Sequence, residues 1–194
     1  MNFIETIKVE DGFLKNLDHH KARAKAVSKH FFGVEKEYEF GELLTKEELK
    51  RVDGVYKLRV IYAKEIESFS FELYRPRKIE ILKLIDGANI DYCYKYEDRE
   101  EIMSLYDQRG DCDDILIIKD GYVTDTSYCN FIFSDGQDLF TPANPLLKGT
   151  KREQLLQEGI LKERDIKVGE LTEYSAFYII NAMFGPLPVK IKTF

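Results

Sequence analysis

Three stretches of the chain carry side chains whose types suit chemistry at a buried site. Lys95 stands in the run Tyr-Cys-Tyr-Lys-Tyr, and burial among aromatic residues favours the neutral, nucleophilic amine. Asp125 precedes an apolar run and stands five residues before Asn130. Gly149 and Thr150 open a segment with helical periodicity, and a helix N-terminus offers unpaired N–H groups and a positive dipole end to an anion. The sequence thus offers an amine, a carboxylate and an anion cradle.

Each stretch also has an ordinary structural interpretation. A lysine among tyrosines is often a strand residue whose amine reaches solvent, and an aspartate before a strand is often a turn residue. Thr150 and Glu153 have the spacing of a capping box, which serves helix stability alone. The local patterns at these positions leave both interpretations open.

An N-terminal α/β half, residues 1–86, is expected to position part of this chemistry. A strand runs into the turn at Asp11 and Gly12, and an amphipathic helix is predicted over 17–32. A capping-box spacing at Thr45 indicates a short second helix, which Gly54 should end. Strand-like runs follow at 55–63, 68–74 and 78–85.

The C-terminal half, residues 87–194, is expected to begin near Gly87, because the segment 86–96 has few helix signals. Beyond it the sequence predicts a helix over 98–108 and a strand with its turn over 113–121. A hairpin over 126–142 bends at Asp135-Gly136, and a helix covers 151–161. No repeat or low-complexity stretch interrupts this order.

Composition narrows the class of protein. The 35 acidic and 29 basic residues give a net charge of −6, so nucleic acid is not an expected partner. Three cysteines are too few and too widely spaced for a disulfide framework or a zinc site, and no metal site is expected. No signal peptide or long apolar span is visible, so no membrane partner is expected and the predicted location is the cytoplasm.

Longer strings around these residues resemble one family over most of the chain, from Phe3 to about Val189. The strings are FIETIKVEDGFLKNLDHHKAR, GYVTDTSYCNFIF and LFTPANPLLKGTKREQLL. They resemble the class IV aminotransferase and 4-amino-4-deoxychorismate lyase family of pyridoxal-phosphate (PLP) enzymes, with fold type IV, like D-amino-acid aminotransferase. The resemblance implies an α+β fold of two domains, with a shortened N-terminal α/β domain and a β-barrel-like C-terminal sheet with helices.

The same resemblance assigns roles to individual positions. Lys95, thirty residues before Asp125, takes the place of the lysine that forms a Schiff base with the cofactor. Asp125 takes the place of the acidic residue, usually Glu, that pairs with the pyridine nitrogen. Arg23, three residues after His20, matches a phosphate ligand. The remaining implied cofactor-binding residues are Asn130, Gly149, Thr150, Lys151, Asn181 and Ala182.

Some positions depart from the family pattern. The turn reads Lys-Gly-Thr-Lys-Arg where the family has a PGITR-like turn, and Asn181-Ala182 replaces a TGT-like tripeptide, which removes one expected hydroxyl from the cradle. Lys83 is the nearest alternative lysine, but it lies far out of register with the family position.

The resemblance favours a lyase that eliminates pyruvate from 4-amino-4-deoxychorismate. An aminotransferase for D-amino or branched-chain amino acids is the second hypothesis, and a non-catalytic PLP-binding relative is the third. Arg75 and Arg77 are candidates for holding a substrate carboxylate, alongside Lys57 and Arg59. Because the family assembles as dimers, a homodimer is expected.

Overall fold

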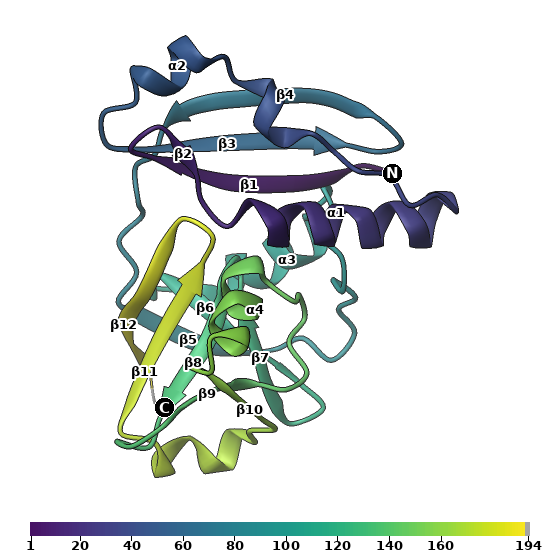
Figure 1. Ribbon diagram of the computed structural model, residues 1–194. Helices are drawn as coiled ribbons and strands as arrows, with labels where there is room; N and C mark the ends of the chain where they lie inside the picture. The colour runs from purple at the N-terminus through teal and green to yellow at the C-terminus, as the bar shows by residue number, and fades with distance from the viewer. Residues whose placement is uncertain (193–194) are drawn as a thin grey trace. The chain divides into compact units, whose positions relative to one another are not determined.

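The computed structural model describes residues 1–192, which form two compact units (Figure 1). Unit 1 consists of Met1–Pro76 and Tyr94–Asp98, and unit 2 of Arg77–Cys93 and residues 99–192. The expected boundary near Gly87 differs from this division in two ways. The strand before Gly87 is hydrogen-bonded into the sheet of unit 2, and the short segment Tyr94–Asp98 returns to unit 1.

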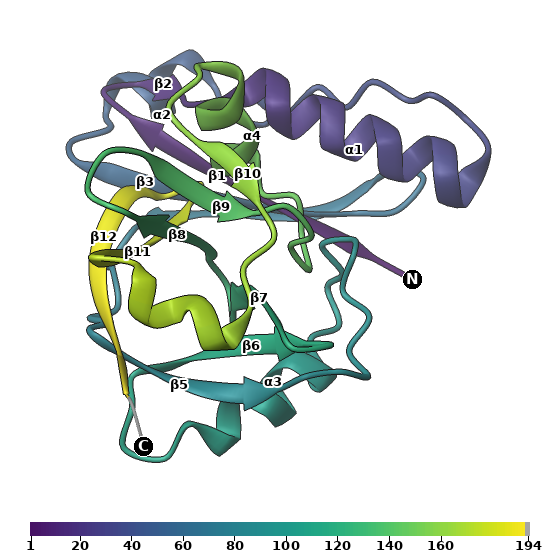
Figure 2. The ribbon, with the colours of Figure 1, turned by 90° about the horizontal axis from the view of Figure 1, so that it is seen from below.

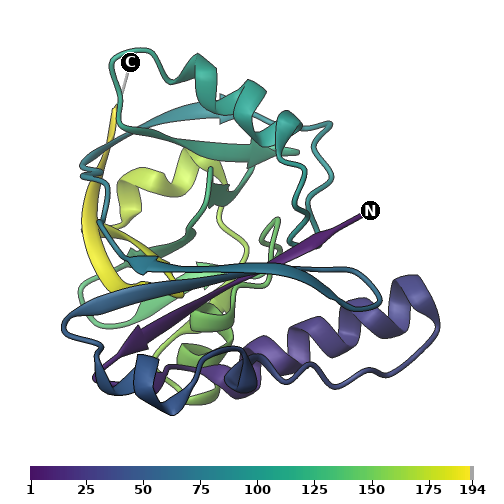
Figure 3. The same ribbon diagram turned by 90° about the horizontal axis from the view of Figure 1, so that it is seen from above.

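Unit 1 is built on a four-stranded antiparallel sheet with the order β2-β1-β3-β4. Its strands are β1 (Phe3–Glu10), β2 (Phe13–Leu14), β3 (Val55–Tyr62) and β4 (Ile66–Leu73), and its helices are α1 (Leu17–Phe32), α2 (Lys46–Lys50) and the 3₁₀ turn η1 (Phe40–Leu43). Figure 3 shows α1 running along the sheet. The capping box predicted at Thr45 and Glu48 is formed, although α2 already ends at Lys50.

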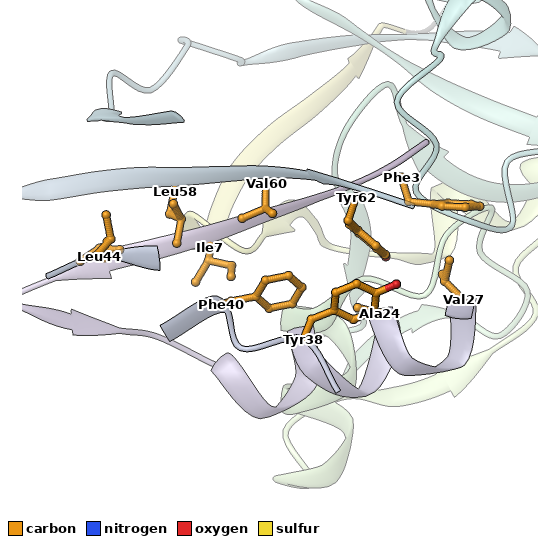
Figure 4. Packing of buried hydrophobic residues seen from close by; sticks show 11 residues of the cluster. Phe3, Ile7, Ala24, Val27, Tyr38, Phe40, Leu44, Leu58, Val60 and Tyr62 are labelled. Carbon is orange, nitrogen blue, oxygen red and sulfur yellow. The ribbon is translucent and has the colours of Figure 1, made fainter. Parts of the chain in front are cut away.

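The core of unit 1 lies between the sheet and α1 (Figure 4). Alternate residues of β1 and β3 point to this face, as expected for strands with one covered side. Aromatic rings fill much of the space, and Tyr38 and Phe40 stack with ring centroids 5.8 Å apart. The segment Tyr94–Asp98 extends the sheet edge, because the amide of Ile4 donates to the carbonyl of Lys95 at 2.9 Å.

Unit 2 is a β-barrel with helices, which confirms the fold expected from the resemblance. Six strands follow one another in the order β8-β11-β12-β5-β6-β7, and β7 also pairs with β8, so the ring closes (Figure 2). The strands are β5 (Ile81–Asp86), β6 (Asp114–Lys119), β7 (Tyr122–Thr126), β8 (Asn130–Ser134), β9 (Leu139–Pro142), β10 (Lys162–Arg164), β11 (Ala176–Asn181) and β12 (Phe184–Lys192). The pair that closes the ring is Asp125 with Asn130.

Helices and turns complete unit 2. They are α3 (Glu100–Tyr106), α4 (Thr150–Gln157) and the 3₁₀ turns η2 (Asp107–Arg109) and η3 (Val168–Glu173). The hairpin predicted around Asp135-Gly136 is confirmed as β8 and β9, with Gly136 at φ +94°. Among residues 1–192, no helix has the length and apolar character needed to cross a membrane.

Candidate active site

Lys95 lies in unit 1, on the segment that pairs with the first residues of β1. The carbonyl of Lys95 accepts the amide of Ile4, and Phe3 bridges to Tyr96 in antiparallel fashion. The side chain of Lys95 is half-buried. Its charge helps to lower the pKa of His20, so its amine lies within electrostatic range of α1. Tertiary structure thus brings Lys95 near the helix that carries Arg23.

A buried ion cluster joins β1 to α1 in the same unit. Glu5 is fully buried and receives Arg23 in a two-point contact, Nε to Oε1 at 2.8 Å and Nη2 to Oε2 at 2.6 Å. The Nδ1 of His20, also buried, lies 2.5 Å from Glu5 Oε2. His20 and Arg23 can share one carboxylate because residues three apart on a helix lie on one face. The expected phosphate ligand Arg23 is therefore held by an acidic residue of β1.

The charges in this cluster set one another's pKa values. Burial alone would raise the pKa of Glu5, but the charge of Arg23 and the hydrogen bonds from His20 and Arg23 outweigh it and lower that pKa to about 2. Burial lowers the pKa of His20, and the charges of Arg23 and Lys95 add to this effect against the opposing pull of Glu5. At neutral pH the cluster therefore contains an ionised Glu5 and a neutral His20.

In unit 2, Asp125 lies at the point where the barrel closes. Its Oδ1 accepts the Nδ2 of Asn130 at 2.8 Å, and its Oδ2 accepts the amide of Leu147 at 2.9 Å. The same Asn130 amide donates to the carbonyl of Leu147 at 2.8 Å. Burial raises the pKa of Asp125 to about 6, although these hydrogen bonds and the charge of Arg152 oppose the shift. A nearby cation, such as a protonated pyridine nitrogen, would stabilise the ionised form of Asp125.

The start of α4 lies against this cluster. A β-carbon on Gly149 would lie 2.0 Å from Oδ1 of Asn130, so only glycine allows this approach. Gly149, and not Thr150, is the N-cap, and no side chain caps the helix. The capping-box interpretation of Thr150 and Glu153 is therefore wrong, because Thr150 has already entered the helix. The first N–H groups of α4 lack a side-chain cap, as a phosphate site at this end requires.

Arg152 ties this helix start to the strands beside it. Its side chain is 1% exposed, and its Nη2 donates to the carbonyl of Pro142 at 2.8 Å and to Glu163 at 2.6 Å. Its Nη1 donates to Glu153 at 2.6 Å. Because Pro142 ends β9 and Glu163 lies in β10, Arg152 holds the first turn of α4 against both strands.

The other expected cofactor residues of unit 2 lie at the β11–β12 turn and in α4. Asn181 ends β11, where its Nδ2 donates to the sulfur of Cys129 at 3.4 Å and its Oδ1 accepts the amide of Met183 at 2.8 Å. Cys129 is the neighbour of Asn130, so the β11–β12 turn lies beside the Asp125 cluster. Ala182 follows in that turn and is half-buried. Lys151 reaches Gln154 at 3.0 Å on α4.

The expected substrate arginines and the alternative lysine lie elsewhere. Arg75 is exposed beyond the end of β4 in unit 1. Arg77, in unit 2, donates to the hydroxyl of Tyr106 at 2.9 Å, and its guanidinium lies 5.0 Å from the ring centroid of Tyr128. Lys83 donates to the carbonyl of Gln108 at 2.8 Å on the outside of β5.

Comparison with known proteins agrees with the fold of the chain. A family model described as amino-transferase class IV matches residues 101–191. An uncharacterized protein of Haemophilus influenzae is 35% identical over 182 residues, which is 93% of this chain and 97% of that protein. A crystal structure from Haemophilus somnus 129PT, of a protein proposed to be a 4-amino-4-deoxychorismate lyase, is 30% identical over 94% of this chain and 96% of its own, with a TM-score of 0.85.

A PLP-bound structure of a hypothetical aminotransferase from Mycobacterium tuberculosis shares the fold. It has a TM-score of 0.77 at 17% identity and covers 98% of this chain and 81% of its own. The protein is in the class of fold type IV proteins, as shown by its fold, the closure of its barrel and the uncapped start of α4. Within that class, the chain belongs to the class IV aminotransferase family.

Two residues that matter for the geometry were not singled out from the sequence. Glu5 stands in an FIETIKV strand, and its position on the buried face is visible only as part of the alternation Phe3, Glu5, Ile7. That alternation places a carboxylate among apolar residues, which is a usable signal for a functional charge. Arg152 gives no comparable signal, because it stands in a run of charged residues.

Proposed function

We propose that the chain is a PLP-dependent enzyme of the class IV aminotransferase family with Lys95 as the attachment point. The single observation that carries this proposal is the cluster of Asp125, Asn130 and Gly149. It joins a buried carboxylate to a helix start that tolerates no side chain. The residues present therefore fit a ligand with a ring nitrogen and a phosphate.

The proposed roles follow from the chemistry of each side chain. When bound, PLP supplies an aldehyde for amines and a ring that withdraws electrons from the substrate. Asp125 would keep the ring nitrogen protonated, because a buried carboxylate next to a cation stays ionised. Backbone N–H groups at the start of α4 would bind the phosphate, and the family resemblance assigns Arg23 to the same group. Lys95 would move a proton at the substrate carbon.

We propose 4-amino-4-deoxychorismate as the substrate, with 4-aminobenzoate and pyruvate as products. The 30% identity to the Haemophilus somnus protein supports this choice. Transamination of a D-amino or branched-chain amino acid is the alternative within the same family. The two activities are separated by incubating the PLP-loaded protein with 4-amino-4-deoxychorismate and, separately, with amino acids and 2-oxoglutarate. Formation of keto acid without any 4-aminobenzoate would overturn the lyase proposal.

The attachment of the cofactor has its own test. The purified protein is expected to be yellow with PLP, and borohydride should bleach it and leave the added mass on the peptide that contains Lys95. Lys95→Ala should abolish this modification. Lys83→Ala is the matched control, because the amine of Lys83 donates to the carbonyl of Gln108, away from the Asp125 cluster. Modification of the Lys83 peptide in the wild type would overturn the assignment.

The changed turn and tripeptide leave one further hypothesis, a relative that binds PLP without turnover. Full cofactor loading of the wild type together with no product from either substrate class would favour it. Turnover that disappears in Lys95→Ala would exclude it.

A further inference from the structure

We propose that Glu5 is a positioning residue that presents Arg23 to the phosphate of the cofactor. This inference rests on the proposed function and deepens it. Glu5 touches neither substrate nor cofactor in this scheme, and it acts through the guanidinium that it holds.

The two-point contact between Glu5 and Arg23 fixes the plane of the guanidinium group. Two nearly parallel N–H···O bonds, at 2.8 and 2.6 Å, leave the group little freedom to rotate. The carboxylate is fully buried in β1, whereas the side chain of Arg23 keeps 15% of its exposure. Glu5 therefore holds the guanidinium of Arg23 in place, while part of the Arg23 side chain reaches the surface.

His20 holds the carboxylate from a second direction. Its ring contacts the same oxygen, Oε2, that accepts Nη2 of Arg23, so one oxygen receives two groups from α1. The carboxylate thereby joins β1 to one face of α1 at two points. Lys95 lies within electrostatic range of His20, and Tyr62 lies within electrostatic range of Glu5 and Arg23.

Stability alone gives little reason for such an arrangement. Burying a carboxylate and a guanidinium costs more free energy than burying apolar side chains of the same volume. Replacing a buried ion pair by apolar residues is therefore often neutral or stabilising. The cluster lies within an apolar core, since Phe3 and Ile7 flank Glu5 on the same face of β1. An apolar side chain in place of Glu5 would therefore have neighbours to pack against. We therefore explain the cluster by its effect on Arg23, which it orients toward an anion, and not by core packing.

The test compares PLP with pyridoxal, which lacks only the phosphate. Binding constants are measured by absorbance for the wild type, Glu5→Gln, Arg23→Gln and the double variant. Glu5→Gln should weaken PLP on the order of tenfold to a hundredfold and leave pyridoxal nearly unchanged. The double variant should lose no more of the PLP preference than Arg23→Gln, because both changes remove the same contact. Glu10→Gln is the matched control, since Glu10 lies on the same strand and forms an ion pair with Lys8.

The possible negative results distinguish the positioning role of Glu5 from the proposed function. Equal weakening of both ligands by Glu5→Gln, or an unchanged PLP preference, would overturn the positioning role while the proposed function stands. A wild type that binds PLP no better than pyridoxal would overturn the phosphate assignment and this inference together. Should Glu5→Gln fail to fold, Glu5→Asp keeps the charge but withdraws it by one methylene, and a selective loss of PLP preference is again expected.

Discussion

Oδ1 of the Asn130 side chain lies so close to Gly149 that a methyl group there would stand only 2.0 Å from it. Asn130 is itself fixed by Asp125 and the carbonyl of Leu147. The start of α4 and the buried carboxylate are therefore parts of one rigid arrangement, although Gly149 stands 24 positions after Asp125 in the sequence.

Gly149→Ala should disrupt that arrangement. The new methyl must displace either Asn130 or the first turn of α4, at an expected cost of about 1–3 kcal/mol in the free energy of unfolding. PLP affinity should fall as well. Gly169→Ala is the control, because no atom lies within 4 Å of a β-carbon built there. Urea unfolding and PLP titration measure both effects, and an unperturbed Gly149→Ala protein would contradict the close contact.

Asp125 should make the cofactor-free protein less stable as pH rises. Its folded-state pKa of about 6 exceeds its unfolded value of 3.8, so the folded state binds the proton more tightly. This contribution is present below about pH 4 and is lost as pH rises through 6, with a total of about 3 kcal/mol. Asp125→Asn should remove this dependence. The difference between the two unfolding curves from pH 4 to 7 is the measurement, and a constant difference would exclude the raised pKa.

Glu5 should contribute to stability with the opposite pH dependence to that of Asp125. Its folded-state pKa of about 2 lies below its unfolded value of 4.5, so its contribution is present above pH 4.5 and is lost as pH falls through 2. The expected size is about 3 kcal/mol. Glu5→Gln should therefore be less stable than the wild type at pH 7, and the gap should close in acid. A gap that persists at pH 2 would show that Glu5 is not ionised in the folded state.

Arg152→Gln should loosen the first turn of α4. The side chain is 1% exposed and bonds Pro142, Glu153 and Glu163, and removing one partner of a buried charge pair costs up to about 3–5 kcal/mol. Exposure of Glu163 reduces the expected cost to about 2 kcal/mol. Lys162→Gln on β10 removes an exposed pair with Asp138 and is the control. Thermal unfolding without cofactor measures the difference, and equal midpoints would refute the structural role.

The family resemblance leads us to propose a homodimer. Light scattering should then give twice the 22.7 kDa mass of one chain, at concentrations where PLP is bound. A stable mass of one chain, with or without the cofactor, would end this proposal.

The amino-acid sequence by itself determined the elements whose signals are local. The helix α1 has the predicted bounds of 17–32, because its apolar residues recur with the period of one helical face. The hairpin at Gly136 follows from a turn residue that tolerates positive φ. The sequence strings around Arg23, Asp125 and Gly149 were sufficient to identify the family.

Only the tertiary structure decided which of these residues meet. Lys95 joins β1 by edge hydrogen bonds, and β5 pairs in parallel with β6 and β12, although the sequence gives no local signal for either partner. The burial of Glu5 beneath Arg23 depends on the packing of α1 against β1. Periodicity records which side of an element is apolar, but the element that covers that side is chosen by long-range contacts, and those are formed only when the chain folds.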